Sequence, residues 1–208
     1  MSNGRTMVNV NNHVQENFWI YVVSLLCIFI GIVLGIYAVK YMNNIENDNL
    51  LSYLNSFTQN ISLGNLKYKF IIVDIIKNNI TILIAVWFLG LTMIGIPIIL
   101  LIDVIKGFTL GFTISFIIKS FGVKGISIVL LGVLPQNIIY IPCIIISSVV
   151  SMGFSLNILR DKMNKQWVSN IWVKIASYSF SFIVICIVMC FGFILEAYAA
   201  PNLIKIIL

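Results

Sequence analysis

The sequence has few charged residues: only 10% of its 208 residues are Asp, Glu, Lys or Arg, whereas 60% are hydrophobic. Soluble domains carry a charge on about a quarter of their residues. A soluble chain of this length buries only roughly 70% of the surface that it exposes when unfolded, which leaves too little interior for so much apolar surface. The scarcity of charge therefore excludes a water-soluble enzyme and a disordered chain, and it predicts that lipid surrounds most of the protein.

Histidine is almost absent, since His13 in the polar amino-terminal segment is the only one. One histidine cannot build a zinc site of the usual kind, and a histidine in a polar tail cannot serve an intramembrane serine protease. The nucleotide-binding patterns GxxxxGK[ST] and GxGxxG are also missing. We therefore expect no catalytic residues, no metal, no cofactor and no enzyme activity.

Cysteine is scarce as well, and basic residues are not clustered. The 13 basic residues exceed the 7 acidic ones, for a formal charge of +6. No basic cluster has interleaved aromatic residues, so we expect no nucleic-acid partner. The surplus of positive charge instead bears on the orientation of the protein and on binding to anionic membrane lipid.

The four cysteines lie within apolar runs and are interpreted as small buried hydrophobic residues: Cys27, Cys143, Cys186 and Cys190.

Long apolar runs are what the sequence has in abundance. About 20 consecutive apolar residues are enough for a helix to cross a bilayer. The runs predict an all-α, polytopic integral membrane protein, with a single membrane domain over residues 1–208 and about five transmembrane helices. The predicted spans are 18–39, 80–102, 104–123, 126–150 and 175–195.

Two connections hold most of the charge. In 40–79, apolar residues recur at helical spacing, which predicts two amphipathic helices that lie on the membrane surface or dock a partner. The 154–174 loop has four basic residues and one acidic residue, so the positive-inside rule makes it cytoplasmic and places 40–79 outside. Counted over the whole chain, the 13 basic residues are divided almost evenly between the two sides, six inside and seven outside, so the total does not decide the orientation. Lipid or a partner is expected to contact Arg160, Lys162 and Lys165.

The region 104–142 is harder to assign because prolines and amides interrupt it. Pro135-Gln136-Asn137 breaks the apolar run, and Pro142 follows. Backbone groups freed at such a break need protein or water as partners. Two layouts fit: two spans of which the second is broken, or 104–134 as a re-entrant pair of short helices. In the preceding span, Pro97 predicts a kink.

Glycine pairs at helical spacing indicate faces for close helix packing. Gly31 and Gly35 form a GxxxG pair in the first apolar run. This pair is either a packing face or a chance occurrence in a span that contains glycine. Gly107 and Gly111 provide a second face of small residues, on which another helix backbone can approach closely.

Asp103 and Lys106 lie three residues apart, so they are neighbours on a helix and can pair. Two interpretations remain open. The first is an ordinary ion pair at the membrane boundary. The second is a polar contact within the membrane, where ionisable residues tend to be functional.

Two segments resemble the stage II sporulation protein M family of spore-forming bacteria. The first, GLTMIGIPIILLIDVIKGFTLGFT, covers 90–113, and the second, KGISIVLLGVLPQNIIYIPCIIISS, covers 124–148. The LPQN run with its following proline is the most specific part of the resemblance, and the length and the five-span plan also agree. Related membrane proteins occur outside spore formers, which leaves a role outside sporulation open.

The resemblance implies a multi-pass protein of the bacterial cell membrane, on the mother-cell side of the sporulation septum, that is required for engulfment. It implies a scaffold without hydrolytic activity that recruits and localises two peptidoglycan-remodelling partners, the stage II sporulation proteins D and P. A homo-oligomer stays open. Because the family supplies no catalytic residues, local chemistry and motif membership assign structural or coupling roles to Asp103, Lys106, Gly107, Gly111, Pro135, Gln136, Asn137 and Pro142.

The alternative function is a membrane subunit of a transporter. Transporters build their sites from broken helices with polar residues near the midplane. In that case Asp103, Lys106, Gln136 and Asn137 line a polar path. The absence of an obvious internal repeat argues against this alternative.

Overall fold

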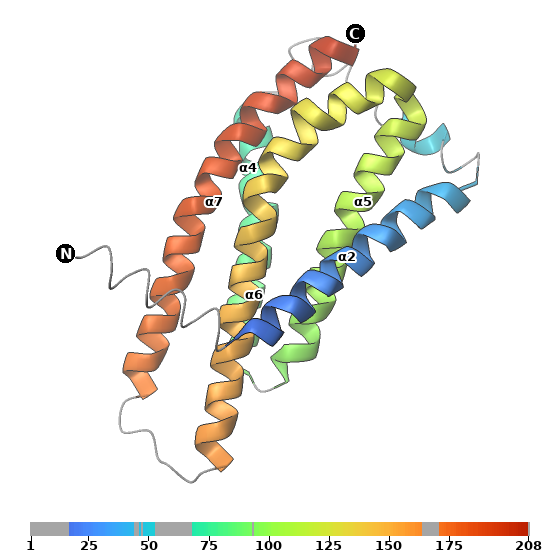
Figure 1. Cartoon of the computed structure of the whole chain (residues 1–208). Helices are drawn as coiled ribbons and strands as arrows, with labels where there is room; N and C mark the ends of the chain where they lie inside the picture. Colours follow the sequence, from blue (N-terminus) through green and yellow to red (C-terminus); the bar gives the residue numbers. More distant parts are fainter. Residues whose placement is uncertain are drawn as a thin grey trace, which may run out of the picture.

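The computed structural model shows an all-α protein, as the sequence predicts (Figure 1). Long helices run side by side, and α2 crosses α5 at an angle. The structure describes residues 17–43, 46, 48–52, 68–92, 94–163 and 171–207. In chain order the elements are α2 (Phe18–Tyr41), α4 (Tyr68–Gly90), α5 (Gly95–Ile128), the π-helix η1 (Val129–Val133), α6 (Leu134–Met163) and α7 (Ile171–Ile207).

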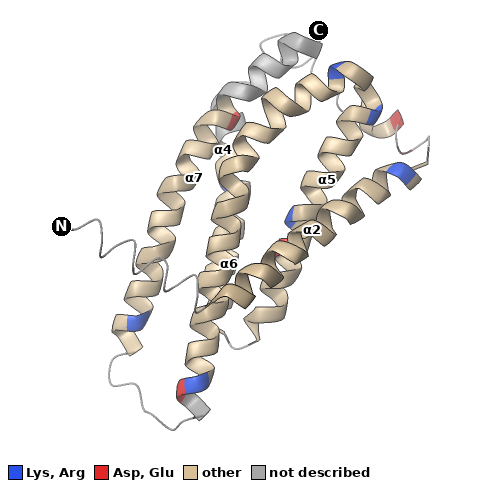
Figure 2. Cartoon of the chain, in the orientation of Figure 1, with Lys and Arg blue, Asp and Glu red and all other residues tan. Residues whose placement is uncertain are grey.

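Three helical segments are long and apolar enough to cross a membrane: Phe18–Tyr41, Gly95–Asp161 and Ile171–Ala197. A shorter apolar helix covers Ile75–Gly90. Charged residues gather mostly near the two ends of the helices, and long uncharged stretches separate them (Figure 2). This distribution is typical of a multi-pass membrane protein, in which charge is confined to the water-facing ends.

The predicted span 80–102 is wrong as a single helix, because the chain turns between α4 and α5. Helix α4 ends at Gly90, and the amide nitrogens of Leu91 and Thr92 donate to carbonyls of the last turn of α4. Helix α5 begins at Gly95, so Pro97 lies in its first turn. Proline is tolerated there because the first amides of a helix have no partner within the helix. Pro97 therefore marks a helix start and not a kink.

The second amphipathic surface helix predicted in 40–79 is also wrong as a separate element. Residues 68–79 are continuous with 80–90 in α4, so this segment belongs to the bundle. The first predicted amphipathic helix rests on Leu50, Leu51 and three later residues. Residues 48–52 are helical, and the remainder of that helix lies outside the described residues.

Gly122 reverses the chain within α5 and divides that element into two parts. Its φ of 57° and ψ of −129° are not helical, and no atom outside its immediate neighbours would lie within 4 Å of a Cβ added there. Beyond it the chain folds back on the first part of α5, since a Cβ on Gly125 would overlap the carbonyl oxygen of Ile117. The helix then continues through η1 into α6 as far as Met163, which favours the layout of two spans over a re-entrant pair of short helices in 104–134. Where the chain crosses the membrane stays a prediction.

The predicted break at Pro135-Gln136-Asn137 takes the form of a π-helix one turn earlier. Pro135 has no N–H to donate to a carbonyl of the preceding turn, so one backbone hydrogen bond of the helix is missing there. The wider π-helical turns of Val129–Val133 lie at this position. Pro142 lies inside α6, which stays helical to Met163. The helix thus changes type just before Pro135 and continues through both prolines.

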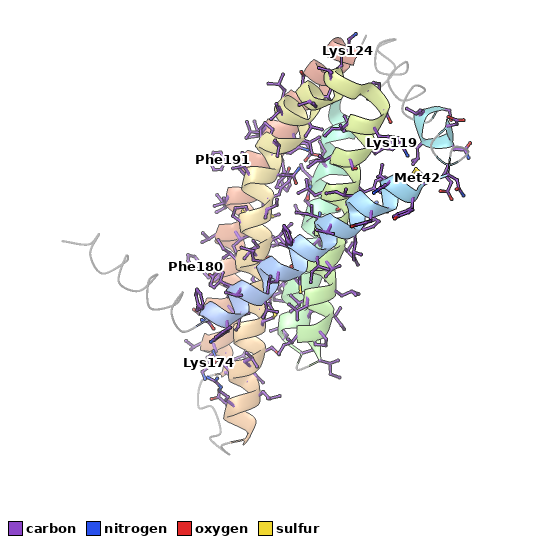
Figure 3. The ribbon with its side chains drawn as sticks, turned by 45° about the vertical axis from the view of Figure 1, so that its right-hand side comes forward. Met42, Lys119, Lys124, Lys174, Phe180 and Phe191 are labelled. Atoms are coloured by element: carbon purple, nitrogen blue, oxygen red, sulfur yellow. The ribbon has the colours of Figure 1, made fainter. Side chains whose placement is uncertain are left out.

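The apolar core lies between α4, α6 and α7 and receives Ile99 from α5. In contrast, Phe180 and Phe191 project outward from α7 with exposed fractions of 66% and 62% (Figure 3). Outward apolar side chains of this kind suit a lipid environment. The buried core residues are Leu83, Val86, Ile99, Tyr140, Cys143, Ile144, Met152, Tyr178, Phe182, Ile185, Met189 and Phe193.

Candidate functional site

Four glycines bring the backbones of α2 and α5 together. A Cβ on Gly31 would overlap the carbonyl oxygen of Val104, and a Cβ on Gly35 would overlap that of Phe108. The reverse also holds, because a Cβ on Gly107 or Gly111 would overlap a carbonyl oxygen of α2. The two glycine pairs found in the sequence therefore face each other. Helices approach this closely only where side chains are absent.

Asp103 lies near one end of the same interface and is fully buried. Ser24 of α2 donates its hydroxyl to Oδ2 of Asp103 at 2.6 Å. Ser148 of α6 donates to Oδ1 at 2.7 Å. One carboxyl group thus joins three helices, and both of its oxygens have a hydroxyl donor, which a buried carboxyl group requires.

The expected pairing of Asp103 with Lys106 does not occur. The two residues are neighbours on α5, but the aspartate faces two serines of other helices. The ammonium of Lys106 instead donates to Oδ1 of Asn79 on α4, over 3.4 Å. Three residues correspond to about 300° around a helix, so the two side chains point in directions about 60° apart. This difference is enough for them to face different neighbouring helices.

Lys106 lines a polar cavity of about 300 Å³ between the helices. Two residues of the LPQN run, Gln136 and Asn137, lie in its wall, and Nδ2 of Asn137 donates to the carbonyl of Val133 at 2.6 Å. Asp103 is absent from the wall, so the structure does not bring together all four residues of the predicted polar path. The wall consists of Ile28, Asn78, Asn79, Lys106, Thr109, Leu110, Thr113, Val133, Gln136, Asn137, Tyr140, Ile141, Ile144 and Glu196.

Glu196 and Tyr140 are two of the cavity residues that sequence reasoning missed. The Tyr140 hydroxyl donates to Oε2 of Glu196 at 2.7 Å. Glu196 stands near the end of the last apolar run, where it resembles an ordinary boundary charge. The only signal in the sequence was a single carboxylate next to such a run, and nothing there links it to Lys106.

A row of serines on α6 was also missed, although its helical spacing was available. Ser151 donates to the carbonyl of Val86 at 3.1 Å, and Ser155 donates to that of Thr92 at 2.9 Å. The Tyr178 hydroxyl donates to the carbonyl of Trp87 at 2.9 Å. The last carbonyls of a helix lack intrahelical partners. Tyr178 and Ser155 bond to carbonyls in and just after the last turn of α4, and Ser151 bonds to a carbonyl one residue earlier. Together these side chains fix α4 to α6 and α7.

The basic end of the bundle contains the 154–174 connection. Lys174 and Asp161 form an ion pair at 2.8 Å. Arg160 joins them around a second cavity of about 630 Å³. Of the other residues predicted to contact lipid or a partner, the Lys162 side chain and Lys165 lie outside the described part of the structure.

The chemistry that these groups support is binding and packing. In the described part of the chain, no three His, Cys, Asp or Glu residues form a group that could hold a metal ion. The four cysteines are free thiols. The cavity offers an ammonium, a carboxylate and several amides, which are groups that recognise a polar ligand.

A comparison with curated proteins and with solved structures gives no match. A family model does match, over residues 24–201. This match includes both segments of the resemblance, the facing glycine pairs and every residue of the cavity wall. Since it covers most of the chain, the protein belongs to the stage II sporulation protein M family.

Proposed function

We propose that the protein is an integral membrane scaffold of the engulfment machinery. In this role it recruits and localises peptidoglycan-remodelling partners, the stage II sporulation proteins D and P, at the septum in the mother-cell membrane. The observation that carries the proposal is the family match over 24–201. The closely packed interior supports it, because a scaffold needs a rigid body more than it needs a moving site.

The scaffold has three working parts. The first is the packed group of helices α2, α5 and α6, in which the four glycines join α2 to α5 and Asp103 joins all three helices. The second is the surface offered to partners, formed by residues 40–79 and the outer faces of the spans. The third is the basic end around Arg160, which contacts anionic lipid or a septal protein.

The test is complementation of a gene deletion in the spore-forming host. Cells that express the wild-type chain are expected to engulf normally and to hold fluorescent D and P proteins at the septum. Cells that express Gly107→Leu should lose both, because leucine cannot fit against α2. Membrane fractionation shows whether each variant is inserted. Normal engulfment with correctly placed partners in the deletion strain would overturn the scaffold role.

The polar cavity favours transport as a second candidate function, since Lys106, Gln136 and Asn137 share one wall. The double variant Gln136→Ala with Asn137→Ala separates the two roles. Loss of a solute flux with intact partner recruitment supports transport. Loss of recruitment or of folding, with no flux defect, supports the structural role.

A further inference from the structure

The cavity between α4, α5, α6 and α7 contains two opposite charges that do not touch. Lys106 of α5 and Glu196 of α7 both line its wall. Within the described residues, the only ion pair with nitrogen and oxygen within 4.0 Å is Lys174–Asp161. Charges inside a membrane bundle are costly unless they are paired. A polar group between Lys106 and Glu196 would complete the pairing.

The wall also has unused capacity to form hydrogen bonds. The Lys106 ammonium has three N–H groups, of which one is directed at Asn79. Oε2 of Glu196 accepts a hydrogen bond from the Tyr140 hydroxyl, and Oε1 accepts none from the described part of the chain. The Gln136 amide makes no hydrogen bond to any described residue, and Asn137 uses only its Nδ2.

We propose that this cavity binds a zwitterion, a group that carries an anion and a primary ammonium a few bonds apart. The Lys106 ammonium binds the anion, Oε1 of Glu196 accepts a hydrogen bond from the ligand's ammonium, and the Gln136 amide contacts the atoms between these two groups. A lone anion would leave Glu196 unpaired, and a lone cation would leave Lys106 unpaired. A volume of about 300 Å³ suits a small polar group.

Two sources provide this chemistry: the phosphoethanolamine headgroup of a lipid and a free amino acid. For the lipid, the full-length protein is released from nanodiscs, and native mass spectrometry compares retained phosphatidylethanolamine with phosphatidylcholine and phosphatidylglycerol. For the free ligand, calorimetry follows a titration with alanine or phosphoethanolamine. Phosphatidylcholine has no ammonium N–H, and phosphatidylglycerol has no ammonium, so we expect neither to compete.

Charge-neutral variants identify the cavity as the site. We expect Lys106→Met and Glu196→Gln each to weaken binding about tenfold, which corresponds to about 1.4 kcal/mol. The matched controls are Lys124→Met and Glu46→Gln, because both residues are exposed and lie outside the cavity wall. We expect the controls to bind like the wild type.

A third variant separates a loss of binding from a loss of folding. Because Gln136 makes no hydrogen bond to the described part of the chain, Gln136→Leu should keep the fold and still weaken binding. Thermal unfolding checks each variant. Failure of both the lipid and the free zwitterions to bind, or equal binding by the cavity variants and the wild type, would overturn the proposal. A preference for anionic lipid that does not depend on Glu196 would also overturn it. The scaffold role is tested separately, in cells.

Discussion

At the scale of single residues, the most informative side chain is Asp103, which is fully buried between three helices. Its two carboxyl oxygens accept hydrogen bonds from the hydroxyls of Ser24 and Ser148. In a membrane, a hydrogen bond between helices contributes on average about 0.6 kcal/mol. Loss of the shared acceptor costs more, because it leaves two buried hydroxyls without a partner.

We therefore expect Asp103→Leu to lower the free energy of unfolding by about 1–3 kcal/mol. Ser24→Ala and Ser148→Ala should each cost only about 0.6 kcal/mol. Denaturant unfolding in bicelles measures all three variants. The control is Asp161→Leu, which removes a partly exposed ion pair and should cost less than about 1 kcal/mol. An Asp103→Leu variant as stable as the wild type would contradict the bridging role.

The sequence identified Asp103 and Lys106 as unusual but could not identify their partners. Spacing along one helix predicts which residues are neighbours on that helix, so it suggested that these two pair. The actual partners are Ser24, Ser148 and Asn79, which are separated from them by 27 to 79 positions. Packing between distant helices decides such contacts, and the pattern of one helix does not contain that information.

At the scale of elements, the contact between α2 and α5 depends on the absence of side chains. A Cβ on Gly31 or Gly107 would overlap a backbone carbonyl, which cannot move aside as a flexible side chain can. We expect Gly31→Ala and Gly107→Ala each to destabilise the protein by about 1–3 kcal/mol in denaturant unfolding. Gly153→Ala is the control, since its nearest atom is 3.3 Å away in a side chain, and it should change stability by less than about 0.5 kcal/mol.

The reversal at Gly122 depends on backbone conformation and not on space. Its positive φ of 57° is costly for residues with a Cβ, while no steric obstacle is present. Gly122→Val should therefore cost about 1–3 kcal/mol of unfolding free energy, because φ of 57° with ψ of −129° is sparsely populated by residues with a Cβ. Gly122→Asn should cost less, because these angles are close to those of the first central residue of a type II′ turn, a position that asparagine adopts more readily than valine. Thermal unfolding of the two variants makes the comparison, and equal losses would contradict this explanation.

The sequence predicted the elements better than their ends. Apolar composition is enough to predict long helices, and the facing glycines were visible as two pairs. The boundary at 91–94 was missed because its residues are nearly as apolar as the helices that they join. Pro97 was available as a signal, but a proline suits both a kink and a helix start. Only the turn before it decides between the two.

At the scale of the whole molecule, the register of α2 on α5 constrains how the chain crosses the bundle. Ser24 meets Asp103, Ile28 meets Gly107 and Ile32 meets Gly111. Each pair has the same sequence separation of 79 positions, so the two helices are parallel. A chain that leaves α2 at one end must return through α4 before α5 can run in the same direction. The parallel contact thus supports alternating crossings.

Alternating crossings lead to a prediction about which ends share a side of the membrane. Met42, Lys119 and Lys124 lie at one end of the bundle, and Lys174 lies at the other (Figure 3). In a background with the four native cysteines replaced by alanine, we expect Met42→Cys and Lys124→Cys to react with an impermeant maleimide added outside intact cells. Lys174→Cys should react only after the membrane is opened, because the positive-inside rule predicts that the basic connection faces the cytoplasm. If Lys124→Cys reacted together with Lys174→Cys and not with Met42→Cys, the chain would not cross between Gly95 and Gly122, and the re-entrant layout would stand. Reaction of both ends from outside would instead contradict the bundle as a membrane-crossing body.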